Sequence, residues 1–169
     1  MALIKAVKGK YPSFGVNCWF AENATIVGEV EMGNNCTVWF NAVVRGDVNV
    51  IKIGDNTNIQ DGAVIHCTYQ KFATTIGSNV SIGHNAIVHG CTIHDNVLVG
   101  MGAIVMDGVV VESEALIAAG AVVLEGTRVE SGFIYAGVPA KKVKPVSDEL
   151  RQVFTRTAGN YIKYSEWFK

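Results

Sequence analysis

Apolar residues recur at every sixth position through most of the chain. A repeat of this kind determines the architecture, so it is considered before local propensities. Read in steps of six from Phe20 to Val129, with two short insertions and one missing residue, all 18 leading positions are apolar. They are Phe20, Ile26, Met32, Val38, Val44, Ile53, Ile59, Ile65, Ile76, Ile82, Val88, Ile93, Val99, Val105, Val111, Ile117, Val123 and Val129.

The fourth position of each hexad provides an independent check, because only the leading positions define the register. It is usually Asn or Gly, the residues that accept the left-handed backbone conformation most readily. These residues are Asn23, Asn35, Asn41, Asn56, Asn79, Asn85, Asn96, Gly62, Gly102, Gly108, Gly120, Gly126 and Gly132. The fifth position is mostly small, as an inward-facing corner requires. The hexad therefore predicts a short strand followed by a tight turn.

Strands that turn repeatedly in one sense close a triangular coil of three strands, and stacked coils pair in parallel about 4.8 Å apart. Eighteen hexads correspond to about six such coils. The period of six excludes an amphipathic-helix or doubly wound α/β fold. We therefore expect an all-β protein, a left-handed parallel β-helix with a C-terminal α-helix.

The repeat ends near residue 140, which divides the chain into a β-helix domain (1–140) and a C-terminal helix (141–169). Ser147 is a suitable helix N-cap, with acidic residues in the turn that follows. Apolar residues then recur at helical spacing from Leu150 to Phe168. We expect this helix to pack on one flank of the β-helix and to carry no chemistry.

Composition excludes several classes of protein. The 169 residues contain 14 Lys and Arg against 15 Asp and Glu, a net charge of -1, so no basic surface for nucleic acid or anionic lipid is expected. No apolar run approaches the roughly 20 residues of a membrane span, and no secretory signal is recognisable. Cys18, Cys36, Cys67 and Cys91 form no C-x-x-C motif. A cytoplasmic protein with free thiols and without nucleic-acid or membrane partners is expected.

Two histidines occupy the same position in hexads that stack on each other. Every third hexad lies on the same face, so the hexads led by Ile65 and Val88 stack on successive coils. Their second residues are His66 and His89, and Arg45 precedes them one coil earlier. Two imidazoles about 4.8 Å apart can both bind one ion through Zn–N bonds of roughly 2.0–2.1 Å.

His84 lies on the neighbouring face, where Asp61 is its equivalent one coil earlier and Gln60 lies beside that residue. It should not reach the other two histidines within one chain, but the adjacent subunit of a threefold assembly would present it. The pattern predicts a homotrimer with three shared metal sites. Three imidazoles with an open fourth position are typical of catalytic zinc, although imidazole also suits iron and cobalt.

Simpler interpretations remain open. Outward-facing histidines are commonly solvated or interfacial, and His94 on the remaining face is expected at the surface. Cys67 and Cys91 adjoin the histidine pair, but their hexad positions favour buried thiols over ligands. Charged residues nearby are as consistent with oligomer structure as with catalysis.

The residues around these histidines resemble the gamma-class carbonic anhydrase family. The matching segments are Arg45-Gly-Asp47, Asn58-Ile-Gln60-Asp61-Gly62, His66, Ile82-Gly-His84, His89-Gly90-Cys91, Val99-Gly-Met101-Gly102-Ala103 and Tyr135-Ala-Gly-Val-Pro-Ala-Lys141. The resemblance extends over residues 11–169. The hexapeptide repeat is shared with many acyltransferases, whereas the ordered histidines and the Asn-x-Gln-Asp-Gly segment are more specific.

The resemblance implies reversible hydration of carbon dioxide to bicarbonate by a zinc-bound hydroxide, or by iron or cobalt in its place. His66 and His89 of one subunit and His84 of the next would bind the metal. The other roles that it implies are hydrogen bonding to the hydroxide or bicarbonate by Gln60, an intersubunit network of Arg45 with Asp47 and Asp61, and a pocket lined by Asn58 and Tyr135.

One departure concerns proton transfer. Val48 follows Asp47 where archetypal family members have a glutamate, and the insertion at 71–75 carries no carboxylate. The resemblance therefore implies slow or buffer-dependent proton transfer and a weak hydratase.

Two other functions fit the repeat. A coenzyme A-dependent acyltransferase or thioesterase would use one interfacial histidine as a general base, which leaves the aligned pair unexplained. A non-catalytic trimeric scaffold would keep the metal for structure alone.

Overall fold

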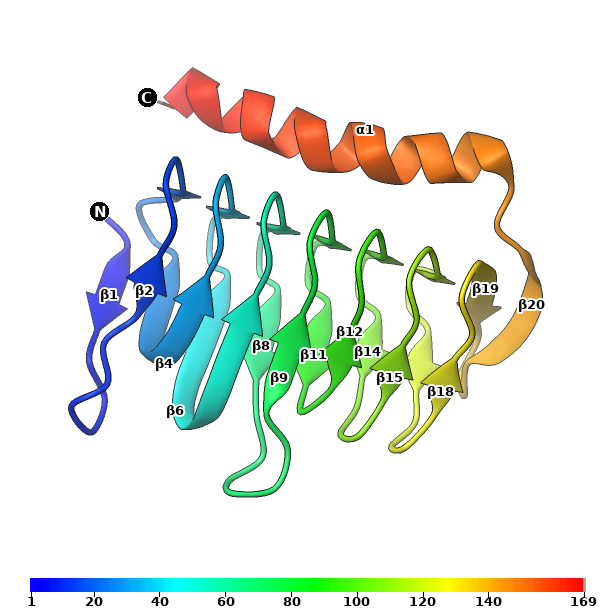
Figure 1. Ribbon diagram of the computed structural model, residues 1–169, viewed down its shortest axis with the longest axis horizontal. Coiled ribbons are helices and arrows are strands. Elements are labelled where there is room, and N and C mark those ends of the chain that lie inside the picture. The colour runs from blue at the N-terminus through cyan, green and yellow to red at the C-terminus, as the bar shows by residue number, and fades with distance from the viewer. Residues whose placement is uncertain (169) are drawn as a thin grey trace.

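In the computed structural model, which describes residues 1–168, the chain winds into a parallel β-solenoid of about seven coils with one C-terminal α-helix (Figure 1). The predicted left-handed β-helix is confirmed. The count of coils exceeds the expected six because three strands outside the hexads from Phe20 to Val129 also pair with the stack. These are β1 (Leu3–Lys5), β2 (Ser13–Phe14) and β19 (Phe133–Ala136), while β3 (Trp19–Phe20) belongs to the first hexad.

Three walls enclose the core, and long strands β4 and β6 bend from the first wall into the second. The first wall contains β1 (Leu3–Lys5), β4 (Thr25–Met32), β6 (Val43–Ile53), β8 (Val64–His66), β11 (Ile87–His89), β14 (Ile104–Val105) and β17 (Val122–Val123). The second wall contains β2, the ends of β4 and β6, β9 (Thr74–Ile76), β12 (Thr92–Ile93), β15 (Val110–Val111) and β18 (Arg128–Val129). The third wall contains β3, β5 (Thr37–Val38), β7 (Asn58–Ile59), β10 (Ser81–Ile82), β13 (Leu98–Val99), β16 (Leu116–Ile117), β19 (Phe133–Ala136) and the antiparallel β20 (Lys141–Pro145).

Left-handed backbone conformations make the corners, as the fourth position of the hexad predicts. Asn56, Asn79 and Asn96 have φ values of 55°, 57° and 56°. Their side chains also form a ladder, because each amide donates to the next amide oxygen, over 3.1 Å from Asn56 to Asn79 and 3.2 Å from Asn79 to Asn96. Asn23 is the exception to the prediction, since it is not among the described residues with positive φ.

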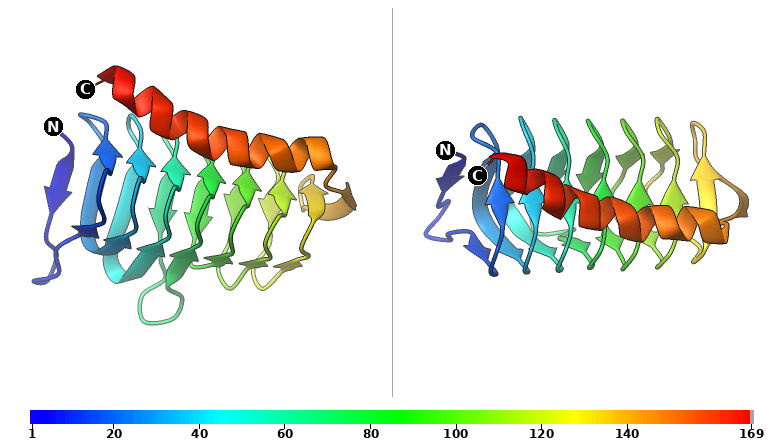
Figure 2. Two further views of the ribbon diagram at one scale, coloured as in Figure 1. Left: turned by 45° about the horizontal axis from the view of Figure 1, so that its top comes forward. Right: turned by 90° about the horizontal axis from the view of Figure 1, so that it is seen from above.

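The three walls differ in what they present outward. The outward residues of the second wall are largely polar, and helix α1 (Asp148–Ser165) contacts strands of the third wall. Figure 2 shows the helix running along the prism from its last coil back to its first. The first wall presents a row of aliphatic side chains, namely Val43, Val64, Ile87, Ile104 and Val122. Within residues 1–168, the main contacts of α1 are with β5, β7 and β10 of the third wall, so this apolar row lies outside them.

Helix α1 begins where the sequence predicts. The Ser147 hydroxyl caps it by accepting from the Leu150 amide at 3.4 Å, and Phe154 and Ala158 are buried against the coils. Near its end, the Tyr161 ring packs edge-on against Trp39 with centroids 5.1 Å apart. In residues 1–168, neither α1 nor the following 3-10 turn, Glu166–Phe168, has the length and apolar character needed to cross a membrane.

Candidate metal centre

His66 and His89 are paired residues on adjacent strands of the first wall. Their Cα atoms are register partners in the β8–β11 ladder, which confirms the predicted stacking. His66 Nδ1 lies 3.0 Å from His89 Nε2, and the ring centroids are 5.0 Å apart. The two imidazoles therefore direct one nitrogen each toward a common point.

Asp47 fixes the outer nitrogen of His66. Its Oδ1 lies 3.0 Å from His66 Nε2, and Arg45 donates to its Oδ2 at 2.6 Å. Burial raises the pKa of Asp47, but hydrogen bonds from His66 and Arg45 outweigh burial and lower this pKa below its ordinary value. The carboxylate is ionised at neutral pH and only accepts, so His66 Nε2 carries the proton.

Asp107 fixes the outer nitrogen of His89. Its Oδ1 lies 2.6 Å from His89 Nδ1, and Thr68 donates to its Oδ2 at 2.6 Å. Burial raises the pKa of Asp107, yet the hydrogen bonds from Thr68 and His89 lower it overall. A β-carbon at Gly90 would collide with this carboxylate, so only glycine fits beside it.

The inner nitrogens of the two rings face each other. With the carboxylates accepting from His66 Nε2 and His89 Nδ1, the inner nitrogens lie 3.0 Å apart. Two ring nitrogens at this distance can share one cation, either a proton or a metal ion. The donor set therefore fits a metal bound by imidazoles whose other nitrogens are held by carboxylates.

His84 lies at a different corner, where the third wall meets the first. Its Nδ1 is 2.8 Å from Asp61 Oδ2, and its Nε2 is 3.2 Å from the Tyr161 hydroxyl. Within the described part of one chain, no three His, Cys, Asp or Glu side chains form a cluster that could hold a metal. His84 is thus separate from the histidine pair in a single chain, as its hexad position predicts.

Gln60 and Asn58 belong to the His84 side of the molecule. Gln60 donates to Asn58 Oδ1 at 3.0 Å, and Asn58 in turn donates to Ser81 Oγ at 2.8 Å. Both amides are buried. Gln60, His84 and Tyr161 line one cavity of about 470 Å³ that is otherwise mostly apolar.

Tyr135 is not brought to either group of histidines, which corrects the role expected from its motif. It pairs with Ile117 in the third wall, where it occupies an inward position in the last coil. Its hydroxyl lies 3.4 Å from the Glu130 amide and 3.5 Å from the Arg128 carbonyl. Tyr135 closes the end of the core.

Tyr161 contacts the candidate site, and no motif of the sequence indicates this contact. It was expected only to pack, as part of the apolar stripe of α1, yet its hydroxyl contacts His84. Burial and the nearby negative charge of Asp61 raise the pKa of Tyr161 to about 12, so it stays protonated at neutral pH. No spacing rule relates residues 77 positions apart, so only the folded structure shows this contact.

The remaining candidates behave as expected from the sequence. Cys67 and Cys91 are buried thiols, and burial raises the pKa of both, to about 12 for Cys91. His94 is on the second wall with its side chain 48% exposed, 3.9 Å from Glu112.

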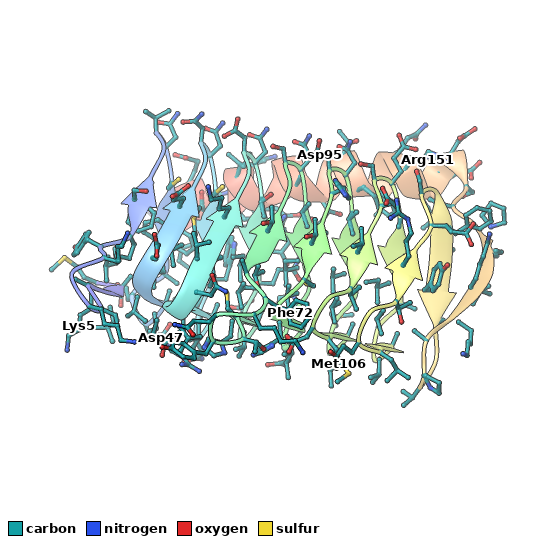
Figure 3. All side chains as sticks on the ribbon, turned by 60° about the horizontal axis from the view of Figure 1, so that its bottom comes forward. Lys5, Asp47, Phe72, Asp95, Met106 and Arg151 are labelled. Atoms are coloured by element: carbon teal, nitrogen blue, oxygen red, sulfur yellow. The ribbon has the colours of Figure 1, made fainter. Side chains whose placement is uncertain are left out.

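Figure 3 shows Asp47, Phe72 and Met106 along one edge of the prism and Asp95 along the opposite edge.

Comparison with known proteins agrees with the hexapeptide-repeat fold. Residues 73–103 and 90–125 match the family described as bacterial transferase hexapeptide (six repeats). A Methanocaldococcus jannaschii protein named "Probable carbonic anhydrase" is 49% identical over 150 residues, covering 89% of this chain and 94% of that protein. Gamma carbonic anhydrase 2 of Arabidopsis thaliana mitochondria is 40% identical over 162 residues. The alignment covers 93% of this chain but only 58% of the plant protein.

Among solved structures, a Bacillus cereus protein described as a candidate acetyltransferase superposes with a TM-score of 0.95 at 33% identity. The match covers 99% of this chain and 96% of that one. The chain belongs to the gamma-class carbonic anhydrase family of hexapeptide-repeat proteins.

Proposed function

We propose that this protein is a metal-dependent, gamma-type carbonic anhydrase-like enzyme that hydrates carbon dioxide reversibly to bicarbonate. The observation that carries the proposal is the pair of stacked imidazoles of His66 and His89, whose inner nitrogens lie 3.0 Å apart and whose outer nitrogens each face a carboxylate. Zinc is the metal we favour, and iron or cobalt would suit the same ligands. When bound, such an ion supplies the Lewis acidity that makes water nucleophilic at neutral pH.

A homotrimer supplies the third ligand in this proposal. The aliphatic first wall is flanked by the His66 and His89 pair at one corner and by His84 at the other. If three first walls face a common axis, the apolar row is buried and each His84 approaches the pair of the next subunit. One packing arrangement then accounts for both the apolar row and the incomplete ligand set.

The side chains around His84 orient it for this role. Asp61 Oδ2 lies 2.8 Å from His84 Nδ1. With the proton on Nδ1, the Nε2 lone pair is available to an ion and accepts from Tyr161 in a single chain. The hydrogen bond to Asn58 fixes the Gln60 side-chain amide at the edge of the same cavity. In this proposal, Gln60 orients the incoming water and the departing bicarbonate. Arg45 and Asp47 hold His66.

The test is metal analysis of anaerobically purified protein together with a carbon dioxide hydration assay at several buffer concentrations. The proposal expects one metal per subunit and activity that is lost in His66→Ala and rises with buffer concentration. His94→Ala, on the second wall, is the matched control and should keep both metal and activity. Metal at full occupancy without hydration in concentrated buffer would contradict the enzymatic assignment.

A second candidate is an acyl-coenzyme A-dependent transferase or thioesterase, favoured by the likeness to the Bacillus cereus candidate acetyltransferase. It requires one histidine as a general base and gives no role to a fixed pair. Saturable acyl-coenzyme A binding and turnover in metal-free protein would favour it over the hydratase.

A further inference from the structure

Cys18 and Cys36 occupy the same corner of the first two complete coils. The Trp19 amide donates to the Cys36 carbonyl at 2.9 Å, and the residues after the two cysteines, Trp19 and Thr37, are register partners. Neighbours in a parallel ladder lie about 4.8 Å apart. This spacing falls within the roughly 4.4–6.8 Å between Cα atoms that a disulfide spans.

The two thiols also point the same way. Cys18 Sγ donates to the Gly33 carbonyl at 3.1 Å, and Cys36 Sγ donates to the Gly54 carbonyl at 3.0 Å. One coil further, Thr57 Oγ1 donates to the Gly77 carbonyl at 2.9 Å in the same manner. The sulfur pair is therefore the first part of a stack of equivalent side chains, and a hydroxyl follows it.

The two cysteines differ in exposure and acidity. Cys18 is partly exposed, whereas Cys36 is 1% exposed. A hydrogen bond with the Cys36 thiol lowers the pKa of Cys18 to about 7, and the same interaction, with burial, raises the pKa of Cys36. Cys18 thus resembles a peroxide-reactive thiolate, and Cys36 the protected thiol that resolves its oxidised form.

We propose that Cys18 and Cys36 form a reversible redox site that closes to a disulfide when the protein meets a hydroperoxide. The Cys18 thiolate attacks the peroxide, the O–O bond breaks, and hydroxide leaves to give the sulfenic acid. The Cys36 sulfur then attacks Cys18, the S–O bond breaks and water departs. In total, two thiols and one hydrogen peroxide give one disulfide and two waters.

The disulfide would join the first coil to the second beside Trp19, whose ring lies 4.8 Å from that of Trp39. A small-molecule dithiol would reverse it. This site lies at the corner between the second and third walls, away from the first-wall histidines, so the inference does not depend on the proposed function.

The test treats the full-length reduced protein with hydrogen peroxide, blocks remaining thiols after denaturation and maps the peptides without reductant. Both cysteines lie in the tryptic segment 11–45, and cleavage after Glu22, Glu29 or Glu31 separates them. We expect this segment to lose two hydrogens and its glutamyl fragments to stay linked until dithiothreitol is added. Cys67 and Cys91 should remain alkylatable.

Two variants extend the test. In Cys36→Ser, Cys18 should accumulate as a sulfenic acid that dimedone traps, and in Cys18→Ser the segment should resist oxidation at the same dose. Conversion of wild-type Cys18 to sulfinic acid without a link to Cys36 would overturn the proposal. Oxidation of Cys67 or Cys91 at the same rate as Cys18 would overturn it as well.

Discussion

The Asp107 carboxylate lies 2.6 Å from His89 Nδ1 and accepts a second hydrogen bond from Thr68. Carboxylates that hold a ligand histidine in this way typically contribute 10–100-fold to metal affinity. Asp107→Asn should therefore weaken metal binding by about 10–100-fold without unfolding the protein. Competition with a chromophoric chelator measures this.

Asp148→Asn is the matched control, because its side chain is 95% exposed at the start of α1. It should bind metal as the wild type does. Equal metal affinity in the Asp107 variant and this control would show that Asp107 does not support the metal site.

Tyr161 provides a second prediction through its hydroxyl. Tyr161→Phe keeps the ring packed on Trp39 but removes the contact with His84. In a single chain this hydrogen bond occupies the nitrogen that would bind the ion in the trimer. Since one hydrogen bond is worth about 1 kcal/mol, we expect roughly fivefold tighter metal binding in Tyr161→Phe. Tyr164→Phe on the same helix should leave the metal affinity unchanged. A Tyr161→Phe protein with wild-type metal affinity would leave the tyrosine a packing role only.

The apolar first wall predicts the effect of charge on assembly. Ile87→Asp and Ile104→Asp place carboxylates in the aliphatic row and should convert trimers to folded monomers, which lose metal and activity together. Thr92→Asp makes a similar change on the polar second wall and should remain trimeric. Light scattering after gel filtration measures the mass. A trimer that persists in Ile87→Asp would place the interface elsewhere.

The corner ladder predicts an order of stabilities. Asn79 combines φ of 57° with amide hydrogen bonds to both neighbours. Asn79→Gly loses the amide bonds only, whereas Asn79→Ala also carries the left-handed strain of about 1–2 kcal/mol. Chemical denaturation should therefore rank wild type above Gly and Gly above Ala. An alanine variant as stable as the glycine variant would show that the corner is relaxed.

The β-helix was predictable because its period appears in every hexad. The same column arithmetic placed His66 beside His89 and His84 at another corner, since register depends only on counting residues. The hexad count does not reach the first coil because β1 and β2 precede the first regular hexad and are separated by an irregular turn.

The residues that surround the histidines are harder to predict from the sequence. Asp107 lies one coil beyond Gly90. Its contact with His89 depends on the strand register and also on the direction of the Asp107 side chain, and the repeat does not specify that direction. Tyr161 reaches His84 only because α1 returns along the third wall. Tyr135 was assigned to the pocket by its motif, although its inward position in the last coil excludes it.

Mixed trimers test most directly whether neighbouring subunits share each site. His66→Ala and His84→Ala should each be inactive, because one removes a ligand of the pair and the other the partner's contribution. In any trimer containing both variants, one of the three interfaces joins an intact pair to an intact His84. An equal mixture, refolded together, should therefore recover about a quarter of the wild-type activity and bound metal, given cyclic threefold symmetry. No recovery, with mixed trimers verified by mass, would contradict the shared site.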